Sequence, residues 1–331
     1  MAYTVWSAFD TYREEVVDLV TYRTELARSS RDYLKTQINQ LADITPFFPK
    51  TQKKFIDFGS FARRTKIRPL DDIDMLMLLN AGGTTSVHLH ADAYGLRLDN
   101  SAASLAPYAN HNGFIDSNRV LNQIRSSLGS ITNYSKAEIK RSGEAVVLNL
   151  SSYEWAFDVV PAAPINDHEG GTAYYLIPNG VGNWKRTDPR IDARHITAVN
   201  QAHNGQFLPL IRLIKQWRRT FDCPSISSYY LETLAWMAFK DSTSDLDFPD
   251  LLRFFFETAK NYVFRPCPDP KGLGPALDSA VTLEDKIGFY IDFYLAAKWS
   301  ATAIERDANG DTSGALFYWG LVFGDEFPTY G

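Results

Sequence analysis

An Asp-Ile-Asp, preceded by one more aspartate, interrupts an apolar segment, PLDDIDMLMLL, at residues 69–79. The apolar residues are typical of a buried β-strand, in which alternate side chains point to the same face. Asp72 and Asp74 then lie about 6.6 Å apart along one face, while Ile73 and Met75 point to the other. Two like charges at that spacing repel each other unless a cation lies between them. The segment therefore predicts a strand whose carboxylates hold a cation.

A bare Asp-x-Asp is more often a surface pair on an edge strand, so its neighbours decide between the two interpretations. Gly59 and Ser60 follow the predicted strand FIDF at residues 55–58. Such a Gly-Ser turn can bring backbone N–H groups and a hydroxyl up to a phosphate. Asp158, between two apolar residues of a later predicted strand, offers a third carboxylate. Because Mg²⁺ favours carboxylates and is completed by water and substrate phosphates, the combination predicts a magnesium site beside a phosphate site.

The remaining periodicity predicts a mixed N-terminal part and a helical C-terminal part. Residues from about Phe9 to Leu41 are spaced as in a helix, and the segment RSSR at residues 28–31 is a candidate break. The apolar segments AVVLNL and WAFDVVPA, residues 145–150 and 155–162, predict a second pair of strands. Further helices are predicted after residue 207, at residues 208–221, 228–240, 248–264 and 283–305.

These elements predict an α+β fold with two lobes. The first, residues 1–205, combines the long N-terminal helix with a mixed sheet, and the second, residues 206–331, is all-helical. A ligand would lie in the cleft between two such lobes.

Composition excludes several classes of protein. A formal net charge of -5 argues against a protein that grips long DNA or RNA, because such binding depends on many Lys and Arg contacts to phosphates. The only cysteines, Cys223 and Cys267, supply neither a disulfide framework nor a cysteine zinc site, and we expect both to be buried free thiols. No apolar run approaches the ~18 residues of a membrane span, and the N-terminus does not resemble a secretion signal. We expect a cytoplasmic protein.

A cationic stripe is predicted on the helix at residues 208–221. Arg212, Lys215 and Arg219 are spaced i, i+3 and i+7, beside an apolar stripe. Such a stripe is usually a solvated face, but opposite a metal site it would clamp a triphosphate, and Lys215 is the favoured residue. Ser228, at the start of the next helix, is either an anion contact or an N-cap.

Other candidate residues are weaker. His88 and His90 alternate on a predicted strand but have too few companions for a metal site, and a polar strand face is the simpler interpretation. The segment DANGDTSG at residues 307–314 lacks the acidic spacing of a calcium loop and is predicted to be a surface turn. The segment at residues 166–168 either reads a base edge or is a plain loop.

Several motifs, in their order along the chain, carry a resemblance to a known family. GSFARRTKIRPLDDIDMLMLL, FDVVPA, NWKRTDPR, LIRLIKQWRR and SSYYLE resemble the bacterial CD-NTases, which are cyclic-oligonucleotide synthases of the DNA polymerase β nucleotidyltransferase superfamily. Animal cyclic GMP-AMP synthase and oligoadenylate synthase are relatives of that family. The match spans roughly residues 50–235, and within the family it is nearest to the clade termed CdnG.

The resemblance implies a polymerase β-like lobe followed by a helical lobe, and it assigns roles to eight residues. The roles are a site for two Mg²⁺ ions, with Mn²⁺ as a substitute, and a binding site for the donor nucleotide. The metal ligands and catalytic residues would be Asp72, Asp74 and Asp158; the triphosphate would touch Gly59, Ser60, Lys215 and Ser228; and the donor base would stack on Tyr229. From the residues alone, Tyr229 could equally belong to the core.

The implied activity is the condensation of ATP and GTP into a cyclic di- or trinucleotide, with a cyclic GMP-AMP as the first candidate. The resemblance further implies CBASS-type antiphage signalling through an effector protein that senses the product. Two alternatives remain: a nucleotidyltransferase that modifies RNA ends or a small molecule without cyclisation, and a non-catalytic nucleotide-binding scaffold. Three intact aspartates weigh against the scaffold, because carboxylates that repel one another are costly to keep without a cation.

Overall fold

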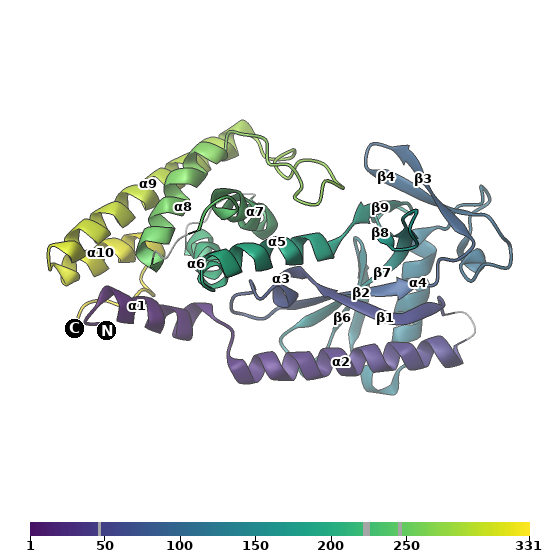
Figure 1. Ribbon diagram of the computed structural model, residues 1–331. Coiled ribbons are helices and arrows are strands. Elements are labelled where there is room, and N and C mark those ends of the chain that lie inside the picture. Colours follow the sequence, from purple (N-terminus) through teal and green to yellow (C-terminus); the bar gives the residue numbers. More distant parts are fainter. Residues whose placement is uncertain (46–47, 221–225, 244–246) are drawn as a thin grey trace. The chain divides into compact units, whose positions relative to one another are not determined.

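The computed structural model describes residues 1–45, 48–220, 226–243 and 247–331, and these form two compact units (Figure 1). The sheet unit comprises Thr21–Arg63 and Leu70–Pro189. The helical unit comprises Met1–Val20, Arg64–Pro69 and Arg190–Gly331.

The sheet unit is built on a mixed sheet, as the predicted α+β class requires. Among the described strands, β2 and β7 form the one parallel pair, and the other pairs are antiparallel. β6 lies off the main path and pairs with β5 and β7. The strand order is β1 (Thr51–Phe58), β2 (Asp72–Leu79), β7 (Ala156–Asn166), β8 (Thr172–Pro178), β9 (Trp184–Thr187), β4 (Ala93–Leu98) and β3 (Thr84–His90), with β5 at Glu138–Ser142 and β6 at Ala145–Asn149.

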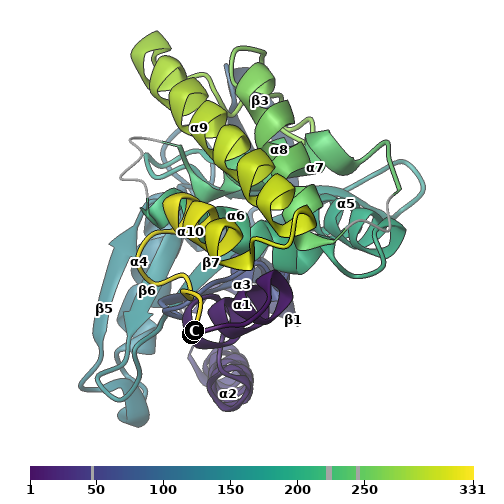
Figure 2. The same ribbon diagram turned by 90° about the vertical axis from the view of Figure 1, so that its left-hand side faces the viewer.

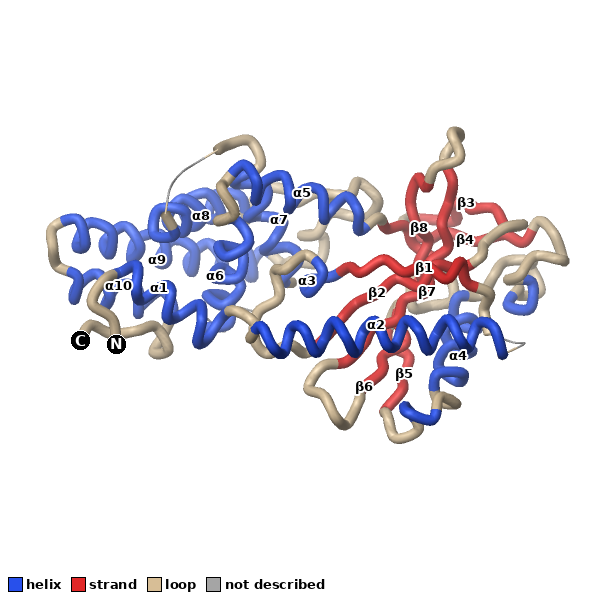
Figure 3. Tube along the Cα trace, turned by 60° about the horizontal axis from the view of Figure 1, so that its bottom comes forward, coloured by secondary structure: helices blue, strands red, loops and turns tan. Residues whose placement is uncertain are grey.

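Helices α2 (Thr21–Ile44), α3 (Gly59–Ala62) and α4 (Ser117–Leu128) complete the sheet unit, and α2 runs along β1 (Figure 3). Arg31 and Lys35 of α2 form ion pairs of 3.0 and 2.7 Å with Asp57 of β1. The predicted break at residues 28–31 is wrong, because α2 is continuous there. The segment contains no Gly or Pro, and Ser30 donates its hydroxyl to the carbonyl of Ala27 within the helix.

The N-terminal helix breaks earlier than predicted. α1 (Val5–Tyr12) continues into a π-helical turn, Arg13–Val17, and Asp18 then adopts an extended backbone before α2 begins. The Asp18 carboxylate accepts hydrogen bonds from Arg13 and from Arg212, so a contact far along the chain supports the break. The local sequence pattern does not predict the contact between Asp18 and Arg212.

The helical unit is organised around a large aromatic core. Trp217 and Phe293 stack with ring centroids 5.1 Å apart, and Phe9 of α1 packs edge-on against Trp319 at 5.0 Å. Helices α8 and α9 run side by side (Figure 2). The helices are α1, α5 (Pro189–Ala202), α6 (Phe207–Thr220), α7 (Ser228–Phe239), α8 (Phe248–Tyr262), α9 (Leu283–Ala308) and α10 (Thr312–Phe323).

The two units divide the chain differently from the predicted boundary at residue 205. The helical unit begins at Arg190 in the C-terminal part, and it also contains the N-terminal helix and the segment Arg64–Pro69. The physical reason is packing: Phe9 and Ile67 are buried in the same apolar core as the C-terminal helices. The predicted location of the active site between two lobes stays a prediction. None of the helices in the described ranges is long and apolar enough to cross a membrane.

Candidate active site

Strand register brings the predicted catalytic aspartates together on the sheet. In the parallel pair of β2 and β7, Asp74 lies directly opposite Asp158, and Asp72 lies opposite Ala156. Paired residues on neighbouring strands project from the same face, and neighbouring strands are about 4.8 Å apart. Asp72, Asp74 and Asp158 therefore share one face of the sheet, and all three are half-buried.

The burial of the intervening residues fixes this register. Ile73 and Phe157 are 1% and 0% exposed and face the opposite side of the sheet. A slip of one residue would exchange the two faces and bury the carboxylates among apolar side chains, at a large desolvation cost. Farther along the aspartate face the side chains are apolar, because Leu76 and Val160 join a buried cluster. The carboxylates are thus gathered at one end of an otherwise apolar surface.

Gly59 is required at its position by both backbone conformation and space. It follows Phe58, which pairs with Asp74, and its φ of 72° lies in the left-handed region that favours glycine. A Cβ atom at Gly59 would lie 1.8 Å from Oδ2 of Asp74, far inside van der Waals contact. The backbone at the start of α3 is therefore pressed against the carboxylate of Asp74, with Ser60 next in the chain. The structure brings four predicted residues of the sheet unit, Gly59, Ser60, Asp74 and Asp158, to one corner of the sheet.

The aspartates fit a divalent cation by donor type and by their shared face. Carboxylate oxygens are the ligands that Mg²⁺ prefers, and two directly opposed carboxylates suit a shared ion. In the part of the chain that the structure describes, no three His, Cys, Asp or Glu side chains converge closely enough to hold a metal ion in the positions they occupy. The three aspartates share a face of the sheet, and their role as a metal platform stays a prediction.

Lys215, predicted to bind phosphate, has protein partners in the helical unit. Its ammonium group donates to the carbonyl of Thr65 at 2.9 Å and to the Glu232 carboxylate at 3.0 Å. The hydroxyl of Thr65 donates to the same carboxylate oxygen at 3.0 Å. The side chains of Lys215 and Glu232 are 6% and 3% exposed, so this is a buried ion pair. A phosphate contact of Lys215 stays a prediction. The sequence signal for this ion pair is that Glu232 is the one acidic residue of the apolar helix α7, and Lys215 is the one lysine of α6 and lies next to its apolar stripe.

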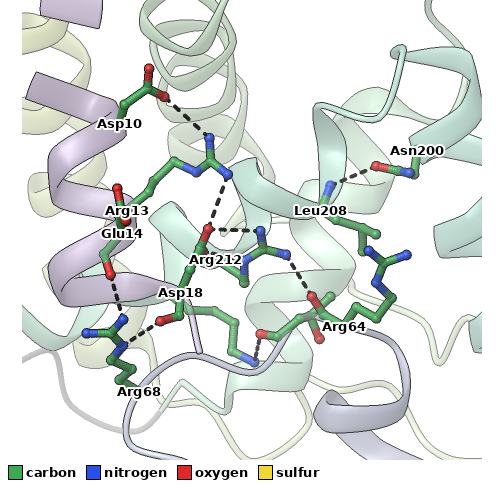
Figure 4. Close-up of polar contacts among 11 residues, drawn as sticks. Asp10, Arg13, Glu14, Asp18, Arg64, Arg68, Asn200, Leu208 and Arg212 are labelled. Atoms are coloured by element: carbon green, nitrogen blue, oxygen red, sulfur yellow. Dashed lines mark hydrogen bonds and ion pairs between the residues drawn. The ribbon is translucent and has the colours of Figure 1, made fainter. Parts of the chain in front are cut away.

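The two arginines of the predicted stripe, Arg212 and Arg219, also contact the chain itself, and Figure 4 shows Arg212. Arg212 donates to the Asp18 carboxylate at 2.7 Å and to the carbonyl of Arg64 at 2.9 Å. Arg219 donates to the carbonyl of Arg68. The spacing of the cations predicts the stripe but not these partners, which lie about 150 residues or more away in the chain.

Ser228 and Tyr229 begin α7. Ser227, not Ser228, is the N-cap, because its hydroxyl accepts a hydrogen bond from the backbone N–H of Tyr230 at 3.1 Å. The hydroxyl of the exposed Ser228 is therefore not used for capping, and its contact with phosphate stays a prediction.

Tyr229 is half-buried and held by charged groups. Its hydroxyl donates to Asp192 at 2.7 Å and accepts from Lys271 at 2.5 Å. The Lys271 ammonium also lies 4.4 Å from the centre of the ring and 2.8 Å from Asp269. Burial raises the pKa of Asp269, but the Lys271 ammonium and backbone N–H groups outweigh it, and the net pKa is lowered. No sequence pattern predicts the contacts of Tyr229 with Asp192, Asp269 and Lys271, because these residues lie on other segments of the chain.

The weaker candidates have structural explanations. His88 and His90 lie on β3 with exposed side chains. Asp167 stabilises the turn between β7 and β8 by accepting hydrogen bonds from the N–H groups of two later residues. Cys267 is a buried free thiol, as predicted, and burial raises its pKa to about 12. Cys223 lies outside the described residues. The segment at residues 307–314 joins α9 to α10, and Asp311 caps α10.

Comparison with known proteins identifies close relatives. No protein-family model matches the chain. The chain is 40% identical, over 334 aligned residues, to a protein of Bacillus cereus strain VD146 named as a probable cyclic nucleotide synthase, and the match covers 100% of this chain and 99% of the relative. It is 28% identical over 281 residues to a cyclic AMP-AMP-AMP synthase from an Acinetobacter species, covering 82% of this chain and 71% of the relative.

Solved structures of two bacterial enzymes share the fold. CdnC of Escherichia coli MS115-1, in a complex with HORMA-deltaN, superposes with a TM-score of 0.72 at 16% identity, covering 97% of this chain and 98% of the other. The apo form of DncV from Vibrio cholerae gives a TM-score of 0.71 at 12% identity, covering 98% and 96%. At these identities the structures show the fold, and the Bacillus cereus relative shows the family. The chain therefore belongs to the bacterial CD-NTases, nucleotidyltransferases that synthesise cyclic oligonucleotides.

Proposed function

We propose that this CD-NTase condenses ATP and GTP into a cyclic di- or trinucleotide, with a cyclic GMP-AMP as the first candidate. The observation that carries the proposal is the placement of Asp72, Asp74 and Asp158 on one face of the paired strands β2 and β7, beside the Gly59 turn. The names of the relatives support cyclisation as the outcome.

In the proposed reaction, the aspartates would hold two Mg²⁺ ions, or Mn²⁺ in their place. When bound, such ions acidify a ribose hydroxyl and offset the charge of phosphoryl oxygens. Asp158 accepts the proton of the acceptor hydroxyl. The hydroxyl oxygen then forms a bond to the α-phosphorus of the donor nucleotide, and the bond from that phosphorus to pyrophosphate breaks.

The remaining proposed contacts hold the donor nucleotide. Backbone N–H groups and the hydroxyl at Gly59 and Ser60 bind the triphosphate, because a tight glycine turn lets backbone donors approach phosphate closely. Tyr229 stacks on the donor base, and Ser228 and Lys215 contact phosphate oxygens. Lys215 does so only by exchanging part of its contact with Glu232, since the two form a buried pair. A second attack within the linear intermediate closes the ring.

The proposed biological role is antiphage signalling, in which an effector protein senses the cyclic product. CdnC, which shares the fold, forms a complex with a HORMA protein. By analogy, a protein partner that switches this enzyme on is part of the proposal.

A second candidate function is nucleotidyl transfer to RNA ends or a small molecule, without ring closure. The formal net charge of -5 disfavours long RNA as the acceptor. A non-catalytic scaffold is the third candidate, and the shared face of three carboxylates weighs against it.

One experiment separates the three candidates. Purified protein is incubated with Mg²⁺ and labelled ATP, GTP, CTP and UTP, singly and in pairs, and the products are treated with phosphatase before separation. A phosphatase-resistant product formed from ATP and GTP supports the proposal, because a ring has no terminal phosphate. Linear products, from which phosphatase removes terminal phosphates, support the second candidate. Stoichiometric nucleotide binding without turnover supports the scaffold.

A further inference from the structure

The segment Arg64–Pro69 lies between two parts of the sheet unit in sequence but belongs to the helical unit. The chain enters it shortly after α3, which begins at Gly59, and leaves it shortly before β2, which carries Asp72 and Asp74. The segment therefore links the turn proposed to bind triphosphate to the strand proposed to hold the metal ions.

Each cation of the α6 stripe donates a hydrogen bond to a backbone carbonyl of this segment. Since the cations are spaced i, i+3 and i+7, they lie along one side of the helix and can follow an extended segment. Figure 4 shows the Arg212 contact. The pairs are Arg212 with the carbonyl of Arg64 at 2.9 Å, Lys215 with that of Thr65 at 2.9 Å, and Arg219 with that of Arg68.

Side chains of the segment add a second set of contacts within the helical unit. The Arg68 guanidinium donates to the carbonyls of Glu14, Glu15 and Asp18, each at 2.5 Å. Carbonyls at a helix end lack partners within the helix, so Arg68 caps the π-helical turn that follows α1. Ile67 is 3% exposed in the core of the unit.

Arg212 is the cation with the best-defined geometry. Its guanidinium donates to both carboxylate oxygens of Asp18, at 2.7 and 3.4 Å, and this two-point contact fixes the plane of the group. The remaining nitrogen is thereby aimed at the carbonyl of Arg64. Arg13 donates to the same Asp18 carboxylate, at 3.1 Å.

We propose that Arg212 is a positioning residue for nucleotidyl transfer. By holding the carbonyl of Arg64, it fixes the backbone that leads from the Gly59–Ser60 turn to the aspartate strand. Only Phe61, Ala62 and Arg63 separate Ser60 from Arg64, so a shift at Arg64 is passed directly to the turn. The inference rests on the proposed function, because it assigns Arg212 a part in that reaction.

Arg13 offers a matched control. Arg212→Met removes the contact with Asp18 and the contact with the carbonyl of Arg64. Arg13→Met removes a contact with the same Asp18 carboxylate but none with the segment, because Arg13 otherwise contacts Asp10 and the ring of Phe248. Both variants lose an ion pair, and only one of them loosens the segment.

The first readout is hydrogen exchange in the nucleotide-free protein, measured by mass spectrometry on peptides that cover residues 59–74. Exchange in Arg212→Met is expected to be about tenfold faster than in wild type or in Arg13→Met, because the segment opens locally. Equal exchange in the two variants would overturn the inference, whatever the protein's activity. This readout also separates the inference from the proposed function, since it needs no turnover.

The second readout is steady-state kinetics of product formation. Displacement of the turn is expected to lower kcat of Arg212→Met about 10- to 100-fold, with KM changed less than about threefold, while Arg13→Met keeps the wild-type kcat. An equal loss of kcat in both variants would assign Arg212 a role in stability alone. If Arg212→Met fails to fold, Arg212→Lys takes its place. Its single ammonium cannot reproduce the planar fork, so an intermediate kcat is expected, and a wild-type kcat would contradict the proposal.

Discussion

The carboxylates of the sheet unit and those of the helical unit are placed by different means. Asp74 and Asp158 lie side by side on the same face of the sheet because the register of β2 and β7 pairs them. In the helical unit, Asp18 contacts Arg212 of α6, 194 residues away in the chain, and Glu232 contacts Lys215, which lies on the preceding helix. Local pattern determines the first arrangement, and tertiary packing determines the second.

This difference teaches how the chain places carboxylates that stabilise the fold and carboxylates that we propose take part in the reaction. A buried carboxylate held by the chain's own lysine, like Glu232, is part of the folded framework, and loss of either partner leaves an uncompensated charge. Carboxylates gathered by register on one face repel one another, and a substrate-borne or metal cation relieves that repulsion.

The largest effect is expected for Asp74→Asn. The change removes one charge of the aspartate face with little change in volume, so product formation should fall below detection while the melting temperature stays within a few degrees of wild type. Asp71→Asn is the matched control, because Asp71 is exposed and precedes the strand. Product formation by Asp74→Asn near the wild-type rate would remove Asp74 from the reaction.

The next effect concerns stability and the pair of Lys215 and Glu232. Lys215→Met alone and Glu232→Gln alone should each lower the free energy of unfolding by about 3–5 kcal/mol, since each leaves a buried charge without its partner. The double variant should lose less than the sum of the two. Urea denaturation of the four proteins measures this coupling. Strict additivity would show that the two side chains do not form a buried pair in solution.

A smaller effect is expected for Gly59→Ala. The new Cβ must displace the Asp74 carboxylate, which lies 1.8 Å from its position, so kcat should fall about 100-fold. Gly113→Ala is the control for backbone strain alone, because Gly113 has a φ of 77° and, apart from its chain neighbours, no atom of the described residues lies within 4 Å of the position that a Cβ would take there. Both changes should cost about 1 kcal/mol of stability. A loss of kcat of the same size in both variants would indicate strain and not the contact with Asp74.

The smallest effect separates two adjacent serines. Ser227→Ala removes the N-cap of α7 and should cost about 1 kcal/mol of stability with little change in KM. Ser228→Ala should leave stability unchanged and raise KM for the donor nucleotide, as its proposed phosphate contact requires. Thermal unfolding and initial rates measure both. A raised KM in Ser227→Ala together with an unchanged KM in Ser228→Ala would assign the phosphate contact to Ser227.

Sequence pattern predicted the parts of this molecule whose geometry is local. The β2 strand, Asp72–Leu79, follows from the apolar run within the segment at residues 69–79. The shared face of Asp72 and Asp74 follows from the alternation of side chains along a strand. The resemblance to the family grouped Asp158 with Asp72 and Asp74, but its position opposite Asp74 was not predicted, because neither strand's sequence determines the register between distant strands.

Contacts between distant segments account for what sequence pattern did not predict. No spacing rule in the sequence predicts three features of the helical unit. These are the end of the helical segment at Asp18, the anchoring of Arg64–Pro69 to α6, and the pairing of Lys215 with Glu232. The helical unit therefore gathers three stretches of the chain, and a single boundary near residue 205 could not describe it.

The central claim is that Asp72, Asp74 and Asp158 form a metal platform. The most direct test measures the binding of Mn²⁺ by electron paramagnetic resonance, in the presence of a non-hydrolysable nucleotide. We expect wild type to bind two ions per chain with nucleotide present, Asp158→Asn to lose one of them, and Asp71→Asn to bind as wild type does. Unchanged Mn²⁺ binding in Asp158→Asn and in Asp74→Asn would contradict the assignment of this face as the metal platform.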